Sequence, residues 1–169
     1  MVNQKPNTLE DLTPLATEVL ATLQSRGMMI ATAESCTGGL IAGTLTEIAG
    51  SSASVERGFV TYSNASKSEL LGVSPDLIEK EGAVSKDVAI AMAEGALIYS
   101  AADISVAVTG IAGPGGGSSD KPVGTVHLAI AMKGEATQHV HCRFAERGRK
   151  GIRLETIQTA LTSILNAIS

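Results

Sequence analysis

The apolar positions along this chain follow two spacings, one typical of amphipathic helices and one typical of buried strands. Apolar residues three or four positions apart form a stripe near the start of the chain and another at its end. The stripes consist of Leu12, Leu15, Val19, Leu20 and Leu23, and of Ile157, Leu161, Ile164, Leu165 and Ile168. Thr13-Pro14 predicts an N-cap and a first-turn proline for the first helix, and Arg26-Gly27 predicts its end.

Short apolar runs between these helices predict the strands of a sheet. The predicted strands are 28–33, 55–62, 104–108, and a hairpin of 123–132 and 136–144. Helical spacing predicts further helices at about 36–48, after an Asn64 cap, around 77–78 and from Ser85 onward. Residues 109–122 are predicted to form a loop.

The order of these elements predicts an α/β fold. It favours a single three-layer α/β/α domain whose mixed, partly parallel sheet is parallel early and antiparallel at the hairpin. No repeat or linker divides the chain, so we assign residues 1–169 to one domain with 1–12 as a partly flexible tail.

Composition narrows the class of protein. The chain has 169 residues, of which 44% are hydrophobic and 2% aromatic, so Ala, Val, Leu and Ile must build the core. A net charge of -4 without a basic run argues against nucleic-acid binding. Two cysteines provide no disulfide framework and favour a reducing cytoplasm. We also expect no signal peptide and no membrane span, because the first ten residues are polar and no long apolar stretch follows.

The segment Ala33-Glu34-Ser35-Cys36-Thr37-Gly38-Gly39 places a serine where a strand turns into a helix. This position exposes the Ser35 oxygen beside unpaired backbone N–H groups and the positive end of a helix dipole. A nucleophile, an anion anchor and a simple N-cap are all open interpretations. Gly38 and Gly39 favour function, because a cap does not need a backbone without side chains. Cys36 is a rival nucleophile, although a small buried hydrophobe is the commoner case.

A second group of candidates follows the next predicted strand. Lys67 is expected in or near the first turn of a helix, where the dipole and partial burial would lower its pKa and make it a usable general base. A serine activated by a neutral lysine is a known hydrolase design. Tyr62 is a candidate proton relay or orienting group. The alternatives are an exposed lysine and an aromatic ring at the sheet edge.

Glycines and arginines near the C-terminal half provide candidate anion contacts. The glycine-rich segment that begins at Thr109, Gly110 and Gly113 is either a phosphate cradle or a mobile loop, and it lacks the Walker and dinucleotide patterns. A basic cluster, either a solvated patch or an anion clamp, consists of Arg143, Arg147, Arg149, Lys150 and Arg153. His127, His139 and His141 have no recognised metal-ligand spacing, so we predict no metal.

Several of these motifs together resemble a known family. They are 33–39, Gly50-Ser51-Ser52, 56–64, Lys67, Gly82-Ala83-Val84-Ser85, 109–114 and 121–126. In these motifs the chain, from about Leu15 to its end, is similar to the CinA C-terminal domain family, also described as nicotinamide-nucleotide amidases. The larger members carry an N-terminal domain associated with nucleotide pyrophosphatase activity, for which we expect no room in this chain.

The resemblance implies hydrolysis of the carboxamide of nicotinamide mononucleotide to nicotinate mononucleotide and ammonia, without a metal or other cofactor. It implies a Ser/Lys dyad: the family's serine falls on Ser35, its lysine on Lys67 and its tyrosine on Tyr62. Its arginine lies before the last helix, where this chain is shifted by one residue; we choose Arg149 over Arg147.

We further expect Thr37, Gly38, Gly39, Thr109, Gly110 and Gly113 to contact the substrate, with oxyanion donors among the N–H groups around Cys36 to Gly39. The expected partner is a small-molecule nucleotide, with no nucleic acid and no membrane; homo-oligomer formation is open. The alternative function is a non-catalytic nucleotide-binding or interaction module, because the family has been linked to competence and DNA damage.

Overall fold

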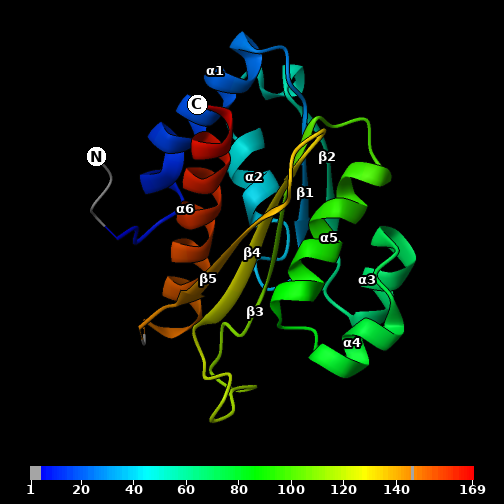
Figure 1. Cartoon of the computed structure of the whole chain (residues 1–169). Helices are drawn as coiled ribbons and strands as arrows, with labels where there is room; N and C mark the ends of the chain where they lie inside the picture. Colours follow the sequence, from blue (N-terminus) through cyan, green and yellow to red (C-terminus); the bar gives the residue numbers. More distant parts are fainter. Residues whose placement is uncertain (1–4, 146) are drawn as a thin grey trace.

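A five-stranded sheet lies between two layers of helices in the computed structural model, which describes residues 5–145 and 147–169 (Figure 1). The strands are β1 Ile30–Glu34, β2 Val55–Val60, β3 Ile104–Gly110, β4 Thr125–Met132 and β5 Gln138–Arg143. Their order is β2-β1-β3-β4-β5. β1 is parallel to both β2 and β3, whereas β3, β4 and β5 are antiparallel. The sheet is therefore mixed and parallel early, as the sequence predicts.

Three helices cover each face of the sheet (Figure 1). On one face lie α1 Thr13–Ser25, α2 Leu40–Thr46 and α6 Gly148–Ile168. On the other lie α3 Asn64–Leu71, α4 Pro75–Glu81 and α5 Lys86–Ile98. Two short 3-10 helices, Glu10–Leu12 and Ser51–Ala53, complete the described elements. No helix in the described part of the chain combines the length and the apolar character needed to cross a bilayer.

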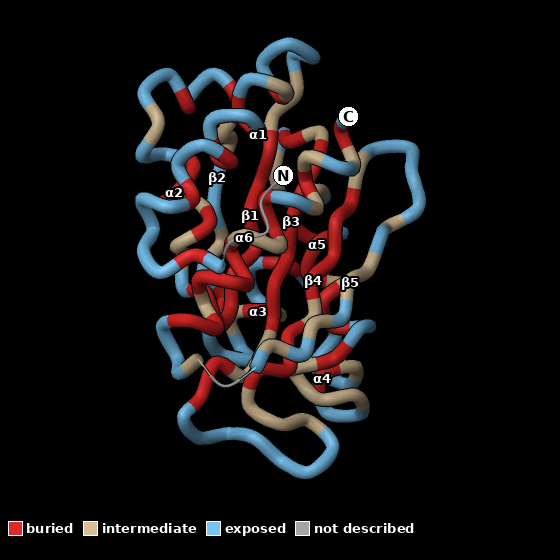
Figure 2. Tube along the Cα trace, turned by 90° about the vertical axis from the view of Figure 1, so that its left-hand side faces the viewer, coloured by how far each residue is buried: buried red, intermediate tan, exposed pale blue. Residues whose placement is uncertain are grey.

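The central strands are buried on both faces, and their alternate residues feed two separate cores (Figure 2). Val106 and Val108 of β3 face α1, α2 and α6, whereas Ala107 faces α5. The buried hydrophobic sheet residues on the α5 side are all alanines, which keeps that core thin: Ala31, Ala33, Ala107, Ala129 and Ala131. The small side chains let α5 approach the sheet closely.

Close packing also joins α5 to α3, the helix that carries Lys67. A Cβ at Gly95 of α5 would clash with the backbone carbonyl of Leu71 at the end of α3. Ser105 Oγ of β3 also donates a hydrogen bond of 2.6 Å to the Ala93 carbonyl of α5. These contacts fix α3 against the rest of the domain, and with it the position of Lys67.

The predicted start of α2 and the predicted end of β3 are wrong. α2 begins at Leu40 instead of about residue 36, because Gly38 and Gly39 adopt positive φ angles of 62° and 96° that a right-handed helix excludes. β3 extends through Gly110, so Thr109 and Gly110 belong to a strand and the loop starts later. The hairpin is confirmed, and so is the start of α5 after Ser85, whose Oγ accepts the Val88 N–H.

Two predicted N-caps are also wrong. A 3-10 turn runs directly into α1, so its N-cap is Leu12 and not Thr13. Ser63 and not Asn64 caps α3, since the Ser63 Oγ accepts the Ser66 N–H at 3.1 Å. Both helices form as predicted: at α3 the neighbouring Ser63 satisfies a free N–H group, whereas α1 continues from the 3-10 turn without a side-chain cap.

Part of the predicted flexible tail lies outside the described residues, namely positions 1–4. In the remainder, Pro6 and Leu12 are buried. Lys5 also pairs with the Glu155 carboxylate of α6 at 3.1 Å. Residues 5–12 are thereby joined to the start of the last helix.

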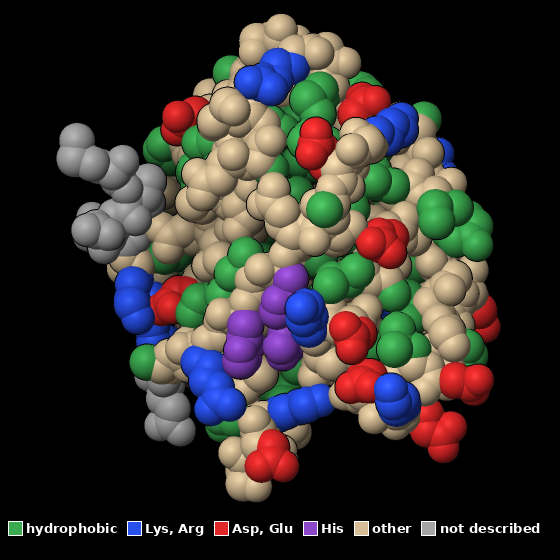
Figure 3. Space-filling model, in the orientation of Figure 1, with side chains coloured by type: hydrophobic (Ala, Val, Ile, Leu, Met, Phe, Trp, Pro, Cys, Tyr) green, Lys and Arg blue, Asp and Glu red, His purple; other side chains and the backbone are tan. Residues whose placement is uncertain are grey.

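The three histidines gather on the α5 side of β4 and β5, where lysine and arginine side chains surround them (Figure 3). The His127 and His141 rings stack with centroids 4.4 Å apart, and His127 Nδ1 lies 2.9 Å from His139 Nε2. Among the described residues, no group of three or more His, Cys, Asp or Glu side chains is arranged to hold a metal ion. Burial, followed by repulsion from His141 and His139, lowers the pKa of His127 to about 4.

The lowered pKa of His127 predicts that the folded protein loses stability in mild acid. The unfolded imidazole takes a proton near pH 6.5 but the folded one only near 4, so the free energy of unfolding falls as pH drops through this window. After allowance for solvent screening, we expect His127→Gln to remove about 1–2 kcal/mol of this pH dependence. Urea unfolding at pH 7.0 and 4.5 measures it. Equal pH dependence in variant and wild type would contradict the prediction.

Candidate active site

Ser35 directly follows β1 at the carboxyl edge of the three parallel strands. Its N–H donates to the Val108 carbonyl at 3.0 Å, which continues the pairing of β1 with β3 by one residue. On the other side, the Thr61 N–H donates to the Glu34 carbonyl at 2.9 Å and continues the pairing with β2. The serine therefore follows a strand that is paired on both sides, at the edge where open α/β folds bind ligands.

Lys67 reaches Ser35 from α3 across 32 residues of sequence. Its Nζ lies 3.1 Å from Ser35 Oγ and 2.8 Å from the Thr61 carbonyl oxygen. The lysine is only 1% exposed and Ser35 9% exposed. Burial lowers the pKa of the Lys67 amine, because a low-dielectric interior disfavours the charged form. The structure thus brings together the two residues that the sequence proposed as nucleophile and base.

Local sequence explains how a lysine comes to lie here. Ser63 caps α3, and the Lys67 N–H makes the first helical bond to the Ser63 carbonyl. Lys67 is therefore in the first turn, where the helix dipole disfavours a cation. No carboxylate accepts a hydrogen bond from its Nζ among the described residues; both acceptors are neutral oxygens. These surroundings therefore stabilise the charged amine less than water does.

The turn after Ser35 leaves only some of its N–H groups for a ligand. The Gly38 N–H donates to the Ser35 carbonyl at 3.0 Å, and the Gly39 N–H donates to the Glu34 carboxylate at 3.1 Å. Among the described residues, no carbonyl or side-chain oxygen accepts a hydrogen bond from the N–H groups of Cys36 and Thr37. Thr37 Oγ1 is also buried without a partner there. Of the N–H groups from Cys36 to Gly39, only those of Cys36 and Thr37 therefore remain candidate donors to an oxyanion.

Cys36 is the rival nucleophile beside Ser35. Its side chain is buried in the core on the α2 side of the sheet. Burial raises the pKa of its thiol to about 11, so the reactive thiolate is scarce at neutral pH. This environment favours a packing role for Cys36.

Arg149 joins Tyr62, the residue after Thr61, to the glycine-rich segment. One guanidinium nitrogen donates to the Tyr62 hydroxyl at 2.8 Å, and the other donates to the Gly113 carbonyl at 2.9 Å. The Tyr62 side chain is 60% exposed. Tyr62 therefore contacts the arginine, and no hydrogen bond between described residues joins its hydroxyl to Ser35 or Lys67.

Arg147 instead belongs to a structural network. It pairs with the buried Glu155 carboxylate at 2.8 Å. It also donates to the Pro6 carbonyl and, at 2.9 Å, to Asn7 Oδ1. Its guanidinium is therefore used to hold the N-terminal segment on α6.

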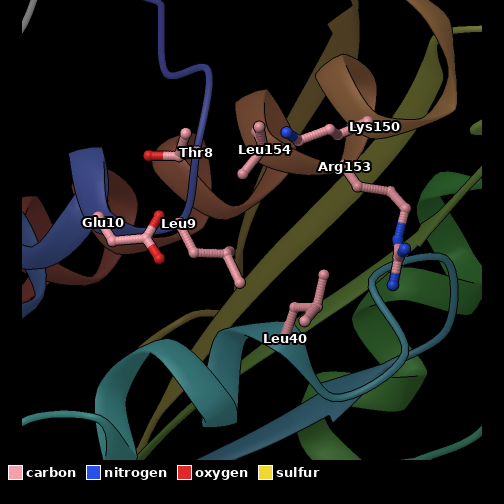
Figure 4. A pocket seen from close by; sticks show the side chains of 7 residues that line it. All are labelled: Thr8, Leu9, Glu10, Leu40, Lys150, Arg153 and Leu154. Carbon is pink, nitrogen blue, oxygen red and sulfur yellow. The ribbon is translucent and has the colours of Figure 1, made fainter.

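The remaining residues of the basic cluster also lie in different places and make different contacts. Arg153, one helical turn after Arg149, donates to the Thr37 carbonyl at 2.9 Å. Lys150 and Arg153 leave α6 in different directions at a hollow of about 300 Å³ (Figure 4). Neither Ser35 nor Lys67 lines this hollow, whose walls are Thr8, Leu9, Glu10, Leu40, Lys150, Arg153 and Leu154. Arg143 contacts the Asp120 carbonyl.

The candidate substrate-binding residues of the glycine-rich segment differ in their burial and in their contacts. Thr109 is buried in β3, and its Oγ1 donates to the Ala83 carbonyl at 2.7 Å. Gly110 pairs with Val126 of β4. Gly113 is buried with a φ of 77°, and its carbonyl accepts from Arg149. The exposed residues 114–120 extend beyond this point.

Sequence reasoning did not assign Glu34 and Thr61 to the site, and it named Arg153 only as a member of the basic cluster. An acidic residue at the end of a wholly buried strand was a signal for Glu34, because unpaired buried carboxylates are costly. The four-residue spacing of Arg149 and Arg153, which places both on one helix face, was a signal for Arg153. Thr61 acts through its carbonyl, which carries no sequence signal.

Known proteins resemble this chain over most of its length. The model of the CinA C-terminal domain matches residues 12–168. The nicotinamide-nucleotide amidohydrolase PncC of Enterobacter agglomerans is 49% identical over 155 residues, which cover 89% of this chain and 94% of that protein. A CinA-like protein of Chlorobium luteolum is 53% identical over 131 residues, which cover 73% of this chain and only 30% of that protein.

A solved structure shares both the fold and the sequence. The competence/damage-inducible protein CihA of Agrobacterium tumefaciens superposes with a TM-score of 0.91 at 51% identity, over 99% of each chain. With the match over residues 12–168, this similarity establishes the family. The chain belongs to the CinA C-terminal domain family.

Proposed function

We propose that this chain hydrolyses the carboxamide of nicotinamide mononucleotide, giving nicotinate mononucleotide and ammonia. The observation that carries the proposal is the buried contact of 3.1 Å between Lys67 Nζ and Ser35 Oγ. The name of the Enterobacter relative, a nicotinamide-nucleotide amidohydrolase, supports the substrate class. The free cysteines Cys36 and Cys142 fit action in a reducing cytoplasm.

In the proposed mechanism, neutral Lys67 takes the proton of Ser35 as the serine oxygen attacks the carboxamide carbon. One Lys67 N–H stays on the Thr61 carbonyl, which turns the nitrogen lone pair toward Ser35. The N–H groups of Cys36 and Thr37 stabilise the oxyanion that forms on the carboxamide oxygen. Protonated Lys67 then gives its proton to the departing ammonia. Water, activated by Lys67, hydrolyses the acyl-serine and releases the carboxylate.

The phosphate of the nucleotide needs a cation near the opening of the site. Arg149 lies there with both donors on neutral oxygens, so an incoming phosphate offers it stronger, charge-assisted bonds. Arg147 is already paired with the buried Glu155 carboxylate. Arg149 is therefore the proposed phosphate ligand, and Tyr62 the group that orients it before binding.

The nucleophile is tested by exchanging neighbouring side chains. We expect Ser35→Ala to lower kcat by about 10³-fold or more, because the bond-forming oxygen is lost. Cys36→Ala should change kcat by less than about fivefold, since its thiol packs and does not react. Ammonia release from the nucleotide by purified protein measures both. Activity retained by Ser35→Ala and lost by Cys36→Ala would reverse the assignment. A wild type that binds the nucleotide without hydrolysing it would favour the non-catalytic alternative.

The role of Lys67 as the base is tested by the pH dependence of kcat/KM and by replacing Lys67 with arginine, which stays charged. Because neutral Lys67 is the active form and burial lowers its pKa, kcat/KM should rise with pH and level off below the ordinary lysine value of 10.5. Lys67→Arg keeps the charge and cannot lose a proton, so we expect a loss of about 10²–10⁴-fold. Lys80→Arg, at a lysine with a 79% exposed side chain, is the matched control. Near-normal turnover by Lys67→Arg would exclude the proposed base.

The phosphate ligand is tested with two substrates. Charge-assisted bonds contribute about 1.5–3 kcal/mol, so Arg149→Ala should lower kcat/KM for the nucleotide about ten- to a hundredfold. Free nicotinamide lacks the phosphate and should lose far less. Arg147→Ala should instead lower the melting temperature and affect both substrates alike, because it breaks the contact with Glu155. Equal losses on both substrates for Arg149→Ala would remove its phosphate role.

A further inference from the structure

A buried carboxylate lies immediately before the candidate nucleophile and takes no part in the proposed chemistry. Glu34 is 0% exposed, and its side chain points to the α2 side of the sheet. Its Oε2 accepts the N–H groups of Gly39 at 3.1 Å and Ile41 at 2.9 Å, and its Oε1 accepts that of Ala42 at 2.9 Å. Three amides thus neutralise a charge that would otherwise be costly to bury.

These bonds close a short loop around Ser35. Glu34 is fixed in β1 by pairing on both sides, and its carboxylate holds the first turn of α2. The turn from Ser35 to Gly39 therefore has both ends attached to one residue. Its path is set by this clamp and by the positive φ angles of Gly38 and Gly39.

The clamp also determines which N–H groups remain for a ligand. The N–H groups of Gly39, Ile41 and Ala42 are used by Glu34, while no oxygen accepts from those of Cys36 and Thr37 among the described residues. A carboxylate in this place makes the α2 terminus unavailable to an anionic substrate. The donors that stay open lie next to Ser35.

We propose that Glu34 is a positioning residue: its carboxylate clamps the α2 terminus and so holds Ser35 Oγ on Lys67 with the Cys36 and Thr37 N–H groups open for the oxyanion. This inference rests on the proposed amidase function. It assigns no proton transfer to Glu34, which contacts neither Ser35 Oγ nor Lys67 Nζ through any hydrogen bond between described residues.

The test replaces one carboxylate oxygen by an amide. In Glu34→Gln the side chain keeps its size, but its NH₂ group opposes a backbone N–H of the turn, so at least one of the three bonds is lost. A small displacement of reacting groups can cost about a hundredfold, so we expect kcat to fall about ten- to a hundredfold. KM should change less than about threefold, because the phosphate contacts are untouched.

The matched control changes another carboxylate that accepts a backbone N–H near β1. Asp103 Oδ2 accepts the Met29 N–H at 2.9 Å, at the opposite end of the strand from Ser35. Asp103→Asn should lower the melting temperature while leaving kcat within about twofold of wild type. A merely structural Glu34 would behave in the same way, with stability reduced and kcat retained.

Amide exchange separates failure of the clamp from failure of the proposed function. In Glu34→Gln, NMR should show faster hydrogen exchange at one or more of Gly39, Ile41 and Ala42, whether or not the protein is an amidase. If Glu34→Gln does not fold, Glu34→Asp, which keeps the charge and shortens the reach, should lower kcat with KM nearly unchanged. Wild-type kcat in a folded Glu34 variant, or unchanged exchange at all three amides, would overturn the inference. A wild type without amidase activity would instead overturn the proposed function.

Discussion

The contact between Lys67 and Ser35 depends on keeping an amine out of water. A lysine that is 1% exposed and bonded only to neutral oxygens has lost most of the stabilisation of its charge. Such burial requires α3 to lie tightly against its neighbours. The alanine face of the sheet and the close approach of Gly95 to the Leu71 carbonyl supply that packing. The small residues of this core therefore support the geometry of the candidate site, because larger ones would move α3 away from the sheet.

The overall fold could be predicted from the sequence because its signals are local. The stripe from Leu12 to Leu23, the apolar run before Ser35 and the hairpin around residue 134 each depend on neighbouring residues. The ends of helices were less predictable, because two neighbouring polar residues can each be the N-cap of one helix. Ser63 and Asn64 are such a pair at the start of α3. α2 starts late because of backbone angles at Gly38 and Gly39, which the glycines permit without requiring them.

The candidate site was predictable where the residue type itself carries the chemistry. Ser35, Lys67 and the choice of Arg149 came from chemistry and family resemblance, and the structure brings the first two together. What the sequence could not provide are contacts set by tertiary structure. The Thr61 carbonyl at Lys67 and the Arg153 contact with the Thr37 carbonyl join segments distant in the chain. Arg147 differs from Arg149 because it pairs with Glu155 and contacts the N-terminal segment. No local sequence pattern reveals these contacts.

Unsatisfied polar atoms give a second view of the same site. Six buried side-chain atoms in the described part of the chain have no hydrogen-bond partner, and three of them are Thr37 Oγ1, Thr61 Oγ1 and Arg153 Nε. Each belongs to a residue that frames the Ser35 turn or anchors Lys67 through another of its atoms. A fold selected for stability alone would pair such groups, since each orphan costs about 1–3 kcal/mol. The presence of three such atoms near the serine, beside an unfavourably buried amine, fits a site in which local stability is given up for function. The Glu34 clamp then has a physical purpose, because a turn with so few bonds of its own needs an external anchor.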